Sequence, residues 1–319
     1  MYKKLSTKNL AIIFILLLVV VLAITFFNDE SKQNTFKSIL VSVDSAMVSK
    51  IIIYPKDKSK NAINLVKDSK GWSINDNGKT YSADINAIMG MLSALKELKP
   101  TRVAAMEQDK WKEYEVTDSA AVRVTTSDVN NNILCDLYIG KFSYQQPKNQ
   151  YQRQGTMSTY VRLKGEDEVY CTEGFLSMTF NADINSLRNK TLISSSPENF
   201  KKLQFIYPAD SSFTLEKLNN KWTVNGLVAD SVKVANYLNS ISNLNSNAIV
   251  ENNTGLITQL YSMKIEGDNM SGLELKAFPA DSINGFILNS NFNPDTYFGG
   301  NQNDLFNKAF ISSKTLLNN

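Results

Sequence analysis

The chain contains no histidine, and this absence removes much of the common catalytic machinery. Without an imidazole there is no Ser-His-Asp triad, no Cys-His nucleophile pair and no zinc site with histidine ligands. The sequence also lacks the glycine-rich fingerprints of nucleotide binding and the C-x-x-C pair of redox and zinc proteins. We therefore expect a protein that is not an enzyme and that holds no cofactor and no metal.

Cysteine is nearly absent as well, because Cys135 and Cys171 are the only two. Both fall in predicted strands. An oxidising compartment would permit a disulfide between them, while small buried thiols in strands would give the same pattern. The sequence leaves both alternatives open, since a bridge requires a Cα separation that cannot be derived from sequence.

A concentration of positive charge is missing too. The formal net charge is +3, and lysines are interspersed with acidic residues along the chain. Because nucleic-acid binding needs a basic face that follows the phosphate backbone, nucleic acid is not an expected partner.

Long hydrophobic runs are absent except for one, Leu10 to Phe27, which carries no charge. As a helix this run would span roughly 27 Å, close to the thickness of a bilayer core. Lys3, Lys4 and Lys8 precede it, so the positive-inside rule places the N-terminus in the cytoplasm. We predict an uncleaved signal-anchor over residues 10–27. A cleaved signal peptide is the alternative, although no clean small-x-small cleavage site follows the run.

The remaining chain carries one order of short motifs twice. A Tyr-Pro pair precedes a strand centred on tryptophan, then a short strand, then an aspartate that opens an amphipathic helix. The second set follows about 150 residues after the first, a period far longer than that of a solenoid repeat. The paired segments are Tyr54-Pro55 with Tyr207-Pro208, Gly71-Trp72-Ser73-Ile74 with Lys221-Trp222-Thr223-Val224, and Tyr81-Ser82-Ala83-Asp84 with Leu227-Val228-Ala229-Asp230.

Each set predicts an α+β module in which one main helix packs on an antiparallel sheet. Asn77-Gly78 is a strong signal for a tight hairpin turn. Asp84 and Asp230 are expected to cap the two helices. Trp72 and Trp222 are expected to anchor the core beneath those helices.

The predicted domain organisation follows from the anchor and the repeat. Residues 1–28 form a cytoplasmic tip and a transmembrane helix, and residues 29–49 form a polar linker. A first module covers residues 50–195, and a second module covers residues 196–319.

One long polar-aromatic loop between two strands is a candidate surface for binding a partner, because functional residues often lie on such loops. It runs from Phe142 to Tyr160, and tyrosine and arginine are typical anchors of protein interfaces. The candidate residues are Tyr144, Tyr151, Arg153 and Tyr160. A disordered hairpin tip is an equally good interpretation.

Carboxylate pairs are plentiful, as in Glu166 with Glu168 and Asp128 with Asp136. A glycosidase without histidine can use two carboxylates that face each other across a cleft. Nothing in the sequence places any pair in that geometry, so a solvated surface is the better interpretation. An envelope hydrolase is the remote alternative.

Several motifs together resemble the bacterial family known as domain of unknown function 4340. They are Gly71-Trp72-Ser73-Ile74, Tyr81-Ser82-Ala83-Asp84, Thr101-Arg102-Val103-Ala104, Val122-Arg123-Val124, Leu137-Tyr138-Ile139-Gly140, Tyr160-Val161-Arg162 and Val169-Tyr170. The resemblance covers about residues 50–195, with a degenerate second copy at about residues 200–315. It carries over no catalytic residue.

The resemblance implies a single-pass protein of the bacterial inner membrane whose modules lie in the periplasm. Proteins similar to it are often encoded beside ABC-type transporters of the gliding-motility or auxiliary kind. We therefore expect a non-enzymatic accessory subunit that associates with the membrane subunits of such a transporter. A module that binds glycan or surface polymer through the tyrosine-rich loop is the second hypothesis.

Overall fold

The computed structural model describes residues 14, 16–19, 37–57, 59–146, 155–251, 258–268, 270 and 272–318. Within these residues, no helix is both long enough and apolar enough to cross a membrane. Most of the predicted anchor at residues 10–27 lies outside the described residues, so the anchor stays a prediction.

The first part of the chain forms a nine-stranded antiparallel sheet in the order β4-β3-β2-β1-β6-β7-β8-β9-β5. Three α-helices and a short 3₁₀ turn accompany it. The strands are β1 (Lys50–Tyr54), β2 (Ile63–Asp68), β3 (Gly71–Asp76), β4 (Lys79–Ser82), β5 (Pro100–Ala105), β6 (Val122–Ser127), β7 (Ile133–Gln145), β8 (Thr156–Leu163) and β9 (Val169–Glu173). The helices are α2 (Ile85–Lys96), α3 (Leu176–Phe180), α4 (Ile184–Leu187) and η1 (Gln108–Lys110).

The second part forms an eight-stranded antiparallel sheet in the order β14-β13-β12-β11-β16-β17-β18-β19. A two-stranded sheet pairs β10 (Thr191–Ser194) with β15 (Asn243–Asn245). The other strands are β11 (Phe200–Ile206), β12 (Phe213–Leu218), β13 (Lys221–Val224), β14 (Leu227–Val228), β16 (Tyr261–Gly267), β17 (Leu273–Pro279), β18 (Phe286–Ser290) and β19 (Asn293–Gly299). The helices are α5 (Ser231–Ile241), α6 (Leu305–Ala309), η2 (Pro197–Asn199), η3 (Gln302–Asp304) and η4 (Ser313–Leu316).

Local signals in the sequence explain the start of each main helix. The Asp84 side chain accepts a hydrogen bond from the backbone N–H of Asn86, and Asp230 accepts two from the first turn of α5. Both predicted caps are confirmed. The Asn77-Gly78 turn between β3 and β4 is also confirmed, with φ of 47° and 80°, because a tight hairpin needs positive φ at both positions.

Each large sheet has its own hydrophobic core beneath its main helix. In the first, α2 buries Ile88, Met91, Leu92 and Leu95 against the sheet. In the second, the buried face of α5 carries Val234, Tyr237, Leu238 and Ile241. The architecture is therefore α+β, as predicted, with antiparallel sheets.

The two predicted core tryptophans lie at the margins of these cores. Trp72 is partly buried and packs against the first core, and Trp222 occupies the same kind of place beside the second. The chain leaves the first core after Leu187 and enters the second at Leu192. The crossing thus falls a few residues before the predicted boundary between residues 195 and 196.

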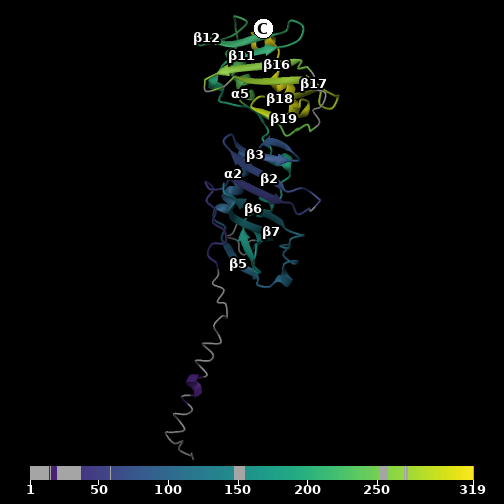
Figure 1. Ribbon diagram of the computed structural model, residues 1–319. Helices are drawn as coiled ribbons and strands as arrows, with labels where there is room; N and C mark the ends of the chain where they lie inside the picture. Colours follow the sequence, from purple (N-terminus) through teal and green to yellow (C-terminus); the bar gives the residue numbers. More distant parts are fainter. Residues whose placement is uncertain are drawn as a thin grey trace, which may run out of the picture.

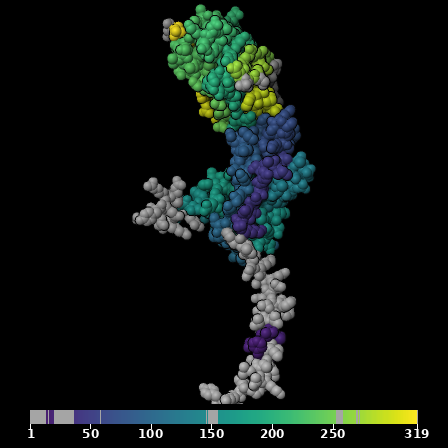
Figure 2. Space-filling model, turned by 90° about the vertical axis from the view of Figure 1, so that its left-hand side faces the viewer, coloured from purple at the N-terminus to yellow at the C-terminus, as the bar shows by residue number. Residues whose placement is uncertain are grey.

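The two sheets stand end to end rather than face to face. In Figure 1 the strands descend from β12 to β19 in the second sheet and continue from β3 down to β5 in the first. The perpendicular view in Figure 2 shows the second part of the chain, green to yellow, above the first, purple to teal. The edge strand β19 contacts the edge strand β4, so the junction is formed by two sheet edges.

A second apolar layer covers the far face of the first sheet. Residues 106–121 fold over this face, and the buried Arg162 is held between two aromatic rings there. Its guanidinium carbon lies 3.6 Å from the centre of the Trp111 ring and 4.1 Å from that of Tyr138. Its Nε donates to the Val116 carbonyl at 3.1 Å. The arginine therefore fastens this segment to the sheet.

The two cysteines lie on opposite faces of the first sheet. Cys135 belongs to the main core under α2, whereas Cys171 belongs to the layer on the far face. Both are buried and free. Burial raises the pKa of the Cys135 thiol to about 12, which keeps it protonated and unreactive at neutral pH.

We predict that neither thiol reacts with a small thiol reagent in the folded protein and that both react after denaturation without reductant. The physical reason is that a sheet separates the two side chains, so they cannot form a bridge. A colorimetric thiol titration with and without denaturant checks this. Thiols that become reactive only after reduction would contradict it.

Candidate functional site

Four exposed apolar side chains lie on β7 and at α3, two elements that contact each other, and we call Phe142, Tyr144, Phe175 and Met178 the aromatic patch. Phe142 and Met178 line one surface depression of about 530 Å³. Tyr144 pairs with Met157 across β7 and β8, and the carbonyl of Met157 accepts a hydrogen bond from Gly174, next to Phe175. Apolar groups gathered in this way on a surface are typical of a contact site for a partner.

The structure separates the predicted loop residues. Tyr144 is half exposed in β7, whereas Tyr160 is buried in β8. The strand alternation puts them on opposite faces of the sheet. The Tyr160 ring lies 4.6 Å from that of Tyr114, and its hydroxyl accepts a hydrogen bond from Arg102.

Tyr160 thus supports the far-face layer and stands apart from Tyr144. Tyr151 and Arg153 lie outside the described residues. Phe142, Phe175 and Met178 were not among the predicted residues, because their exposure depends on where the bulged end of β7 meets α3.

Three of the four carboxylates singled out in the sequence, Asp136, Asp128 and Glu166, have hydrogen-bond or ion-pair partners. Asp136 receives two hydrogen bonds from the Arg123 guanidinium, at 2.7 Å and 2.6 Å. Asp128 caps the β6–β7 turn, and the hydrogen bonds from Asn132 hold its pKa below the ordinary value. Glu166 forms an ion pair with Lys37. These contacts tie strands and turns together.

The junction between the sheets is built around Arg188, directly after α4. Its side chain is only 2% exposed, and its guanidinium carbon lies 3.8 Å from the centre of the Tyr81 ring of β4. Its Nη1 donates to Glu251 at 2.8 Å, and its Nη2 donates to the Thr296 hydroxyl of β19 at 3.4 Å. One side chain therefore contacts both sheets.

The backbone beside Arg188 is held from both sides. The Asn189 N–H donates to the Ser82 carbonyl of β4 at 2.8 Å. The Asn189 carbonyl accepts from the Asn293 amide at the start of β19, at 2.7 Å. The link between the sheets is thereby fixed by hydrogen bonds and not only by chain connectivity.

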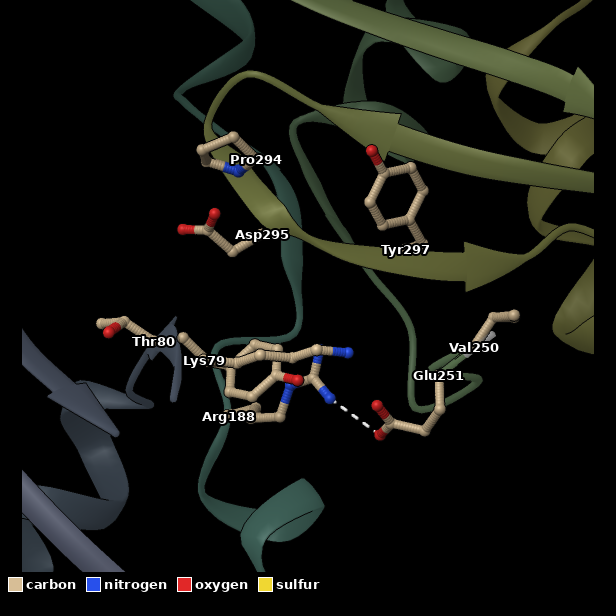
Figure 3. A pocket seen from close by; sticks show the side chains of 9 residues that line it. Lys79, Thr80, Arg188, Val250, Glu251, Pro294, Asp295 and Tyr297 are labelled. Atoms are coloured by element: carbon tan, nitrogen blue, oxygen red, sulfur yellow. Dashed lines mark hydrogen bonds and ion pairs between the residues drawn. The ribbon is translucent and has the colours of Figure 1, made fainter. Parts of the chain in front are cut away.

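A small open cavity of about 340 Å³ lies at this junction. Figure 3 shows Lys79 and Thr80 of β4 on one side and Asp295 and Tyr297 of the β19 hairpin on the other, with the Arg188–Glu251 ion pair at its floor. Two positive side chains, Lys79 and Arg188, and two negative ones, Glu251 and Asp295, line the opening. The cavity is a polar seam between the modules.

The architecture defines an antiparallel α+β protein whose two sheets are joined edge to edge through a buried arginine. The family described as domain of unknown function (DUF4340) matches residues 72–259, more than half of the 319-residue chain. The chain belongs to this family.

The family match is one continuous stretch that starts inside β3 and ends before β16, so it includes β4 and Arg188 but not β19, the other strand of the junction. It runs across the predicted boundary between the modules and does not separate two copies. No curated protein and no solved structure matches the chain.

We predict that Arg188→Met destabilises the protein by about 2–4 kcal/mol, because it removes a buried cation that stacks on Tyr81 and bonds to the second sheet. Glu251→Gln is the matched control. Glu251 is 56% exposed, so water screens its ion pair, and the expected loss is below about 1 kcal/mol. Urea unfolding of the two variants measures both values. Equal losses would show that the ion pair, and not burial and stacking, holds the junction.

Proposed function

We propose that the protein is a non-enzymatic, single-pass envelope protein and an accessory extracytoplasmic subunit of an ABC-type transporter. Membership of the family supports this proposal, because the resemblance that led to the family also implies that association. The charge-free run from Leu10 to Phe27, preceded by lysines, supports anchoring in the inner membrane with the modules in the periplasm.

The observation that carries the proposal is the end-to-end arrangement of the two sheets. The chain enters the first sheet at the end far from the junction, where Val41 and Leu98 exchange backbone hydrogen bonds and Lys37 forms an ion pair with Glu166. With an anchor at residues 10–27, the first sheet is proximal to the membrane and the second is distal. A protein arranged in this way presents one contact surface near the membrane, on the first sheet, and another farther from it, on the second.

We also propose that the second sheet is a diverged copy of the first. Along the chain, both follow the same succession of four strands, a capped helix and further antiparallel strands. Corresponding strands also take the same order within the two sheets, except at the last edge. They differ at that edge, since β5 joins the first sheet whereas its counterpart β15 pairs with β10. The two modules therefore present different edges to a partner.

The aromatic patch is the proposed contact with the transporter. Half-exposed aromatic side chains bury much area at little entropic cost, which suits an interface. We expect the double variant Phe142→Ser with Met178→Ser to keep its fold and to lose at least about tenfold of the recovered transporter subunits. The measurement is crosslinking in membranes, affinity purification and mass spectrometry.

The matched control is the double variant Ile283→Ser with Val129→Ser, since both side chains are exposed but lie away from the patch. Circular dichroism verifies that each variant is folded. Recovery of the wild-type protein only as a free monomer would contradict the proposal. Binding to a glycan array that depends on Tyr144 would favour the second hypothesis, a module that binds glycan or surface polymer.

A further inference from the structure

The first sheet ends in an edge that the second sheet covers. The backbone of Ser82 in β4 points outward, and its carbonyl accepts from Asn189. Tyr81, its neighbour, is only 8% exposed because Arg188 stacks on it. Asp84 also donates its N–H to the Leu187 carbonyl at 2.7 Å. This edge is the site where the next module docks.

The second sheet repeats two of the backbone contacts at this edge. The Ala229 N–H donates to the Trp222 carbonyl at 2.9 Å, as Ala83 does to Trp72 at the same distance. The Asp230 N–H donates to the Leu316 carbonyl at 2.9 Å, as Asp84 does to Leu187.

The two residues of β14 therefore stand where Tyr81 and Ser82 stand in the first sheet. Leu227 takes the place of Tyr81, and Val228 takes the place of Ser82. Leu317, which follows Leu316, takes the place of Arg188.

The repeated edge is uncovered. Leu227 and Val228 are each 64% exposed, and Val232 in the first turn of α5 is 66% exposed. All three are aliphatic, and no charged side chain lies on β14. Leu227 is thus exposed in the second sheet, whereas its counterpart Tyr81 is buried in the first.

The backbone of this edge is also open. Thr223 and Val228 face each other between the bonded pairs of the β13–β14 hairpin, so the N–H and C=O of Val228 point away from β13. Among the described residues, no backbone N–H donates to the Val228 carbonyl, in contrast to Ser82. An open edge of this kind is a template for an added strand.

We propose that the β14 edge is a docking site for an extended segment of another envelope protein, which adds a strand beside Val228 and covers Leu227 and Val232 with apolar side chains. In the first sheet the corresponding edge is covered by the segment around Arg188 and contacts β19 of the second sheet. Because Leu227 and Leu317 replace Tyr81 and Arg188, the second edge calls for an apolar partner and not a cationic one.

A second copy of the chain fits the edge poorly. Two copies that paired β14 with β14 would extend in opposite directions, with their first sheets at the two far ends. Anchors at residues 10–27 could not then insert in one membrane. This step rests on the proposed function, since it assumes the anchor.

The test places p-benzoylphenylalanine at Val228 of the full-length protein in its native membranes. Ultraviolet light is expected to give one adduct with a different envelope protein, and mass spectrometry maps the adduct to an extended apolar segment. The same photoreactive residue at Lys264, an exposed position in β16, is the control and should give no such adduct.

A second variant shows whether the edge itself binds. Leu227→Lys with Val232→Lys puts charge on the edge, and we expect it to lower the Val228 adduct at least about tenfold while the Tm stays near that of the parent. The inference is overturned if the adduct persists in the lysine variant. It is also overturned if Val228 of the parent protein gives no adduct, or gives one only with a second copy of this chain. If transporter subunits are recovered but Val228 gives no adduct, the proposed function holds and the inference about the β14 edge fails. If Val228 gives an adduct with a protein that is not a transporter subunit, the inference about the edge holds and the proposed function is not supported.

Discussion

The arrangement of this protein depends on one buried guanidinium. Arg188 lies between two sheet edges, stacks on Tyr81 of the first sheet and donates to Glu251 and Thr296 beside the second. Burying a cation is unfavourable unless it is well paired, so such a group stays buried only where both sheets are in place. The neighbouring backbone of Asn189 is bonded to both sheets as well. These contacts make the relative placement of the modules a property of the fold.

The first sheet differs from the second because it is covered on both faces. Residues 106–121 form its additional layer, held by Arg162 between Trp111 and Tyr138. Alternate side chains of each strand are therefore buried on opposite faces of the sheet, one under α2 and the other under this layer. Cys135 and Cys171 lie on different faces and so do not meet. The aromatic patch, at the end of β7 and at α3, is one of the places where this part of the chain exposes apolar side chains.

Much of the fold could be predicted from local patterns. The Asp84 and Asp230 caps, the Asn77-Gly78 turn and the α+β class follow from short-range chemistry, and all three agree with the structure. The junction could not be predicted, because Arg188 gains its contacts with both sheets only when β4 and β19 come together in the fold. Tyr160 shows the same limit, since its strand alternation puts it in a buried layer while Tyr144, in the same predicted loop, is exposed.

The central claim is that the Arg188 junction makes the two modules one rigid body. The direct measurement is the distance distribution between spin labels placed at Lys112 in the first module and Lys264 in the second, both exposed. The account predicts one narrow distance in the parent protein that broadens in Arg188→Met. A broad distribution in the parent, or no change in the variant, would contradict it.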